Sequence, residues 1–119
     1  MRFIEKLLEG IQSKKEDAQS KKEVKRVKRE IDTVYFDMND YDISTGEYLT
    51  RNRISLSEAL DRCDIAISMG KSGQKKLSKY DIKGLGLEEE FNRIEDSINY
   101  IKRRKEMIAK VYGQSSKEL

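Results

Sequence analysis

The Gly-Lys-Ser triplet at residues 70–72 is where the chain comes closest to a nucleotide-binding motif. In a P-loop these three residues close a longer motif, whose backbone N–H groups wrap around the phosphates. That motif also needs a glycine five positions before Gly70, where this chain has Ile65, and a preceding strand, where the pattern predicts a helix. We therefore interpret Gly70 as the end of a helix and expect no nucleotide cofactor.

The acidic run at residues 37–42 has the oxygen ligands that a calcium loop uses. An EF-hand loop starting at Asp37 would need a small polar ligand at Tyr41, and one starting at Asp40 would need a glutamate at Arg51. Both alignments fail, so we interpret the run as an acidic turn in water and expect no bound metal.

Nucleophilic and metal chemistry is poorly supplied, since the chain has no histidine and a single cysteine, Cys63. Neither a zinc ligand set nor a cysteine–histidine or serine–histidine pair can be assembled from these residues. The carboxylates are expected on solvated, charged helix faces. We predict a protein that is not an enzyme and has no small-molecule substrate. The lone cysteine excludes an internal disulfide and favours a reducing compartment.

Two lysine-rich stretches could bind phosphate groups, although the formal net charge of the chain is only +3. Acidic residues are interleaved with them, so a solvated basic face is the competing interpretation. Nucleic-acid binding is therefore the alternative function predicted from the sequence. The residues expected to contribute are Lys21, Lys22, Lys25, Arg26, Lys28, Arg29, Lys71, Lys75, Lys76 and Lys79.

The clearest element that could position such groups is a helix over residues 87–112. Its apolar residues recur every three or four positions, which places them on one side of a helix. Three glutamates open the helix, basic residues crowd its second half, and Gly113 is placed to end it. The buried side is predicted to contain Leu87, Phe91, Ile94, Ile98, Ile101, Ile108 and Tyr112.

Two further helices are predicted over residues 24–41 and 57–69. The first follows a seven-residue apolar rhythm typical of a helix packed along a narrow seam, although residues 33–36 are also compatible with a strand. The second begins with a capping box formed by Ser55 and Glu58 and ends at Gly70.

The rest of the chain is predicted to add smaller pieces to a single domain spanning residues 1–119. Residues 1–12 form an amphipathic helix, residues 12–23 a polar linker or an exposed helical bridge, and residues 113–119 a polar tail. Turn residues favour a small β-hairpin around residues 41–50.

The predicted fold is all-α, an up-down-up three-helix bundle over residues 24–112. Hydrophobic residues make up only 36% of the chain and charged residues 39%, which leaves one thin core. Charges run in blocks. The up-down-up order sets basic residues 21–29 beside acidic residues 88–96, and acidic residues 37–42 beside basic residues 102–105.

A second apolar stripe on the last helix, with the N-terminal helix, suggests a binding function. Either these two surfaces cover each other, or both bind another protein or a second copy. Our first hypothesis is a non-enzymatic helical adaptor, regulator or assembly subunit, cytoplasmic and without a membrane role, because no stretch approaches the roughly 20 apolar residues of a membrane span. The predicted contact residues are Phe3, Leu7, Ile11, Tyr100, Met107 and Val111.

Overall fold

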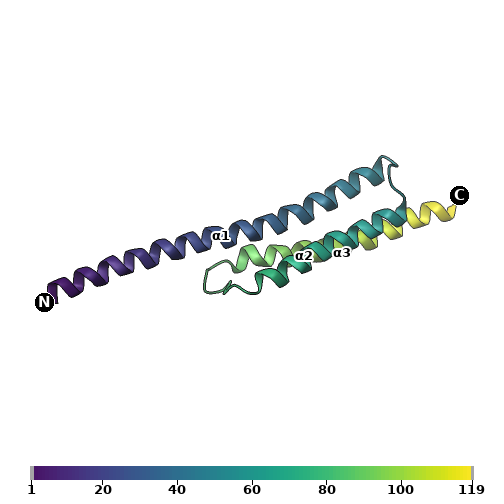
Figure 1. Cartoon of the computed structure of the whole chain (residues 1–119). Helices are drawn as coiled ribbons and strands as arrows, with labels where there is room; N and C mark the ends of the chain where they lie inside the picture. The colour runs from purple at the N-terminus through teal and green to yellow at the C-terminus, as the bar shows by residue number, and fades with distance from the viewer. Residues whose placement is uncertain (1, 119) are drawn as a thin grey trace.

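The computed structural model describes the backbone of residues 2–118 and the side chains of residues 20–113. Its three helices are α1 (Arg2–Thr50), α2 (Leu56–Leu77) and α3 (Glu88–Glu118), and the described backbone contains no strand. The predicted all-α class is confirmed. Figure 1 shows α2 and α3 side by side along the second half of α1, while the first part of α1 extends past them.

The helix directions follow from contacts between residues far apart in the chain. Thr45 of α1 meets Arg62 of α2, and Met38 lies beside Gly70, so α1 and α2 run antiparallel. Asn39 meets Ser97 of α3, 58 positions later, and Asp42 meets Arg104, 62 positions later, so α1 and α3 run in the same direction (Figure 1). The last contact joins the acidic block of α1 to the basic block of α3.

The core is a narrow apolar seam between the three helices. The predicted buried side of α3 is confirmed for Leu87 and the isoleucines, and Phe91 is half-buried. The prediction is wrong for Tyr112, which is 36% exposed. The seven-residue rhythm of α1 also faces the core, with Val24, Val34 and Tyr41 half-buried at its edges. The fully or nearly fully buried apolar residues are Val27, Ile31, Met38, Leu49, Ala59, Cys63, Ala66, Ile67, Leu77, Leu87, Ile94, Ile98, Ile101 and Ile108.

The predicted β-hairpin around residues 41–50 is wrong, because α1 continues as a helix to Thr50. Its turn-forming residues are accommodated by hydrogen bonds to the helix itself. The hydroxyls of Ser44 and Thr45 both donate to the Tyr41 carbonyl, at 2.8 and 2.9 Å. Such back-bonding satisfies hydroxyl groups within a helix. The strand alternative for residues 33–36 is also wrong, because these residues lie within the same helix.

Gly70 does not end α2, which continues to Leu77. Gly70 and Gly73 are both buried and lie where neighbouring helices approach closely. A Cβ at Gly70 would lie 2.7 Å from Ile98 Cγ1 and 2.8 Å from Met38 Cε, and one at Gly73 would collide with Val34. Glycine at these positions is therefore a packing residue, and close packing outweighs its poor helix propensity.

The helix ends use specific backbone devices. Ser55 caps α2 as predicted, since its hydroxyl accepts the Glu58 N–H at 3.1 Å. After α1, Asn52 takes a left-handed conformation (φ 55°), and the Arg53 N–H donates to the Tyr48 carbonyl at 2.8 Å. This pattern is a Schellman motif, which satisfies the last carbonyls of a helix.

The remaining terminal predictions differ from the structure in their boundaries. α1 runs from Arg2 to Thr50 without a break, as in the helical alternative for residues 12–23, and α3 passes Gly113 to reach Glu118. The side chains of Phe3, Leu7 and Ile11 lie outside the described residues.

None of the helices, over the residues that the structure describes, has a stretch long and apolar enough to cross a membrane.

Candidate functional site

The second apolar stripe of α3 is open to solvent. Tyr100 is 51% exposed, Met107 63% and Val111 53%. These fractions are high for large apolar side chains, so the alternative in which the N-terminal helix covers this stripe is not what the structure shows. The other alternative, an uncovered binding surface, remains as a hypothesis.

Helix α1 adds two apolar residues that are more than half exposed and that the sequence analysis missed. Phe36 is 57% exposed and Ile43 is 54% exposed. Phe36 packs edge-on against Tyr35, with ring centroids 5.4 Å apart. Phe36 and Ile43 are seven positions apart, the spacing of two residues on one helix face, and this spacing could have identified them.

The contacts between α1 and α3 place these side chains at alternating levels. Two hydrogen bonds set the alignment: Asn39 lies level with Ser97, and Asp42 lies level with Arg104. Along the bundle axis, Phe36 therefore comes shortly before Tyr100. In the same way, Ile43 comes shortly before Met107. Along the bundle axis the order is therefore Phe36, Tyr100, Ile43 and Met107, alternating between helices. We call these four residues the α1/α3 face.

Two hollows lie between the two helices on this side. The first, of about 520 Å³, is lined by Tyr35 and Asn39 of α1 and by Arg93, Asp96, Ser97, Tyr100 and Arg103 of α3. The second, of about 370 Å³, is lined by Ile43, Gly46, Glu47 and Thr50 of α1, by Arg51, and by Arg104 of α3. Both share residues with the α1/α3 face, so the exposed apolar residues border a grooved surface.

A buried carboxylate lies beside this groove. The Asp42 side chain is only 3% exposed, and its Oδ2 accepts a hydrogen bond from Arg104 Nη1 at 3.0 Å. Its other oxygen, Oδ1, has no hydrogen-bond partner among the described residues. Burial raises the pKa of Asp42 above its usual 3.8, and the nearby Arg104 guanidinium partly offsets this.

A second polar cluster joins α1 to α2 at the same level. The Arg62 guanidinium lies 4.1 Å from the ring centre of Tyr41 and 5.3 Å from that of Tyr48. It donates hydrogen bonds to Thr45 at 2.9 Å and to Ser44 at 2.8 Å. Stacking on aromatic rings and planar hydrogen bonding are characteristic roles of arginine. The turn-like residues of the sequence are thus interhelical contacts.

Cys63 lies on the buried side of α2. Burial raises the pKa of its thiol, and the negative charge of Asp42 adds to the effect. A thiol in this state is a poor nucleophile. Cys63 is therefore a core residue.

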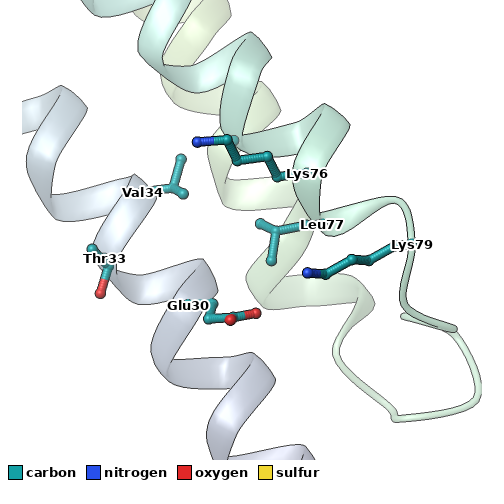
Figure 2. Close-up of a pocket in the computed structure, with 7 residues that line it drawn as sticks. Glu30, Thr33, Val34, Lys76, Leu77 and Lys79 are labelled. Atoms are coloured by element: carbon teal, nitrogen blue, oxygen red, sulfur yellow. The ribbon is translucent and has the colours of Figure 1, made fainter.

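The predicted basic residues are all exposed, and some of them lie close together at one end of the bundle. Arg26 lies 6.0 Å from the ring centre of Tyr80, and Lys79 lies 5.0 Å from it. Lys76 and Lys79 border a groove of about 360 Å³ between α1 and α2, together with Glu30, Thr33, Val34, Gly73 and Leu77. Figure 2 shows both lysine side chains directed toward α1, with the Glu30 carboxylate in the same groove.

The other basic residues of α2 do not join this group. Lys71 and Lys75 line a different hollow, with Asp64, Ile67, Ser68 and Ser72. The basic surface is therefore divided, and Glu30 offsets part of its charge where it is densest.

Among the residues that the structure describes, no three or more side chains of the metal-binding types come together. Comparison of the chain with protein-family models, with curated proteins and with solved structures finds no match.

Proposed function

We propose that this protein is a non-enzymatic helical adaptor or assembly subunit that binds another protein through the α1/α3 face. Its working unit is the three-helix up-down-up bundle, which holds α1 and α3 side by side. The observation that carries the proposal is that Phe36, Ile43, Tyr100 and Met107 are each more than half exposed, and that Tyr100 and Ile43 line the two hollows between α1 and α3.

Single exposed apolar residues are common, but several of them beside a groove are typical of an interaction surface. The composition also fits, since aromatic residues, methionine and arginine are enriched in protein interfaces. Tyr35, Arg93 and Arg103 line the hollow next to Tyr100.

The proposal is tested by replacing Phe36 or Met107 with aspartate in the full chain and measuring partner capture from cells of the natural host. Because both side chains are exposed, we expect unchanged helical circular dichroism and loss of the captured protein. Ile65→Asp is the matched control, since Ile65 is also exposed, at 47%, but lies on α2. Unfolding of both aspartate variants, or capture that persists in both, would contradict the proposal.

Nucleic-acid binding is the second candidate, supported by the gathering of Arg26 and Lys79 around Tyr80. Tyr80 is half-buried against the core, so the support comes from the two cations, which can contact phosphates. This function requires binding to single-stranded DNA or RNA that weakens steeply with added salt and is lost in Arg26→Glu. Absence of binding at low salt would exclude it.

A further inference from the structure

We infer that the partner element recognised by the α1/α3 face is an amphipathic helix with acidic flanks, which lies along the groove between α1 and α3 and completes a four-helix bundle. This inference rests on the proposed function and specifies the chemistry of the partner. Three observations support it: the spacing of the apolar side chains, the shape between them, and the charges beside them.

The apolar side chains are spaced so that a docked helix could contact all of them along one side. Phe36 and Ile43 are seven positions apart on α1, and Tyr100 and Met107 are seven positions apart on α3. Their alternation along the axis puts successive side chains about half a heptad, or about 5 Å, apart on opposite sides of the groove. A helix with apolar residues at every third and fourth position can place one side chain between each pair.

Two shallow, open hollows lie along the surface between these side chains. The two hollows, of about 520 and 370 Å³, follow one another along the α1–α3 boundary. Gly46 contributes to the second hollow because it has no side chain, and a Cβ there would lie 2.7 Å from Arg104 Nη2. A row of side chains from a docked helix fits such a groove, as in helix-in-groove recognition.

The charges beside the groove favour carboxylates on the partner. Arg93 and Arg103 line the first hollow, and neither makes an ion pair or side-chain hydrogen bond with another described residue. Arg51 borders the second hollow. Arginine beside tyrosine is the composition of interface hot spots, and a guanidinium binds a carboxylate through two parallel hydrogen bonds. Glutamates flanking the apolar stripe of the partner helix would supply these acceptors.

The same charges argue against a second copy of this chain as the occupant. A second copy would present the same hollow-lining residues, among which arginines outnumber carboxylates. Like charges facing each other across an interface are unfavourable. The carboxylates in the two hollows, Asp96 and Glu47, are fewer than the arginines.

Site-directed photo-crosslinking tests the inference in the full chain. Tyr100→p-benzoylphenylalanine is expressed in the natural host, illuminated, and the crosslinked peptide is identified by mass spectrometry. We expect a peptide from a different protein with apolar residues every third and fourth position and a net negative charge. A basic or non-helical peptide, or one from a second copy of this chain, overturns the inference. With a basic or non-helical peptide from another protein, the proposed function stands. Absence of any crosslinked protein overturns both.

A charge-reversal pair supplies the quantitative test. Combining Arg93→Glu with Arg103→Glu is expected to reduce the crosslink yield roughly tenfold. The matched control combines Lys71→Glu with Lys75→Glu, two exposed positions on α2 with the same change in charge, and is expected to leave the yield unchanged. Equal loss in both pairs, or no loss in the arginine pair, would show that the arginines do not select the partner.

Discussion

Arg104 of α3 donates a hydrogen bond to Asp42 of α1 across 3.0 Å, and the carboxylate that receives it is almost completely buried. The two residues are 62 positions apart, so this contact ties the end of the chain to its first helix. Asp42 also has an oxygen without a hydrogen bond among the described residues. The hydrogen bond from Arg104 offsets part of the free-energy cost of burying this carboxylate.

Arg104→Ala is expected to destabilise the bundle by about 2 kcal/mol, the usual cost of leaving a buried polar group without its partner. Protonation of Asp42 limits the loss. Urea denaturation measures the change in the free energy of unfolding. The control is Lys105→Ala, which removes a pair with Asp64 at 2.7 Å that is exposed to solvent, and its effect should be smaller. Equal losses in the two variants would mean that burial of Asp42 does not matter.

The raised pKa of Asp42 predicts an unusual dependence of stability on pH. Between the usual pKa of 3.8 and the higher native value, the native protein binds the proton more often than the unfolded chain does. The contribution of this residue to the free energy of unfolding therefore increases as the pH falls through that window.

Asp42→Asn should abolish this contribution. Measured from about pH 7 down to about pH 4, the wild-type protein should gain stability relative to the asparagine variant. Parallel curves, or a relative loss at low pH, would show that burial does not raise the pKa of this carboxyl.

Alanine at the two packed glycines of α2 should destabilise the protein by about 2 kcal/mol each, as expected for an overfilled core. At Gly73 the added methyl group collides with Val34, so Val34→Ala should relieve part of the loss in Gly73→Ala. Thermal unfolding of the single and double variants measures the coupling. Ser72→Ala is the control at an exposed position of the same helix and should be neutral or slightly stabilising. Additive losses at Gly73 and Val34 would contradict the contact.

Asn52→Ala should cost about 1 kcal/mol, because a residue with a Cβ and no local hydrogen-bonding group resists the left-handed conformation. Asn52→Gly should be at least as stable as the wild-type protein. The same argument applies to Gly86, whose φ is 71° in the turn before α3. Denaturation midpoints of the two Asn52 variants and the wild-type protein check this, and an Asn52→Ala variant as stable as the wild-type protein would contradict it.

The sequence predicted the parts of the fold in which periodicity and local capping decide the outcome. The isoleucines of α3 recur at helical spacing because one side is buried, and Ser55 begins α2 because its own hydroxyl satisfies a nearby N–H group. It could not predict where α1 ends. Ser44 and Thr45 favour a turn locally, and they stay helical where Arg62, from a different helix, donates to both. Gly70 was misassigned for the same reason, since its partners Met38 and Ile98 belong to other helices.

The candidate site was half visible in the sequence. Tyr100 and Met107 stand out because they lie off the buried stripe of a strongly periodic helix. Phe36 and Ile43 did not stand out, because one lies in a strand-like stretch and the other in the predicted hairpin. Their relation to Tyr100 depends on the alignment of α1 with α3, which is set by contacts such as Asn39 with Ser97. That alignment is a tertiary property that local spacing does not encode.

The polar contacts around Asp42 and Arg62 also limit how the helices can slide past one another. Along a seam of isoleucines, a shift by one helical turn replaces one apolar contact with another of similar energy. Here the same shift would move Arg62 away from Thr45 and Arg104 away from Asp42, and the buried polar groups would lose their hydrogen bonds. These contacts therefore hold the three helices in one alignment, which also fixes the positions of Phe36 and Ile43 on α1 relative to Tyr100 and Met107 on α3.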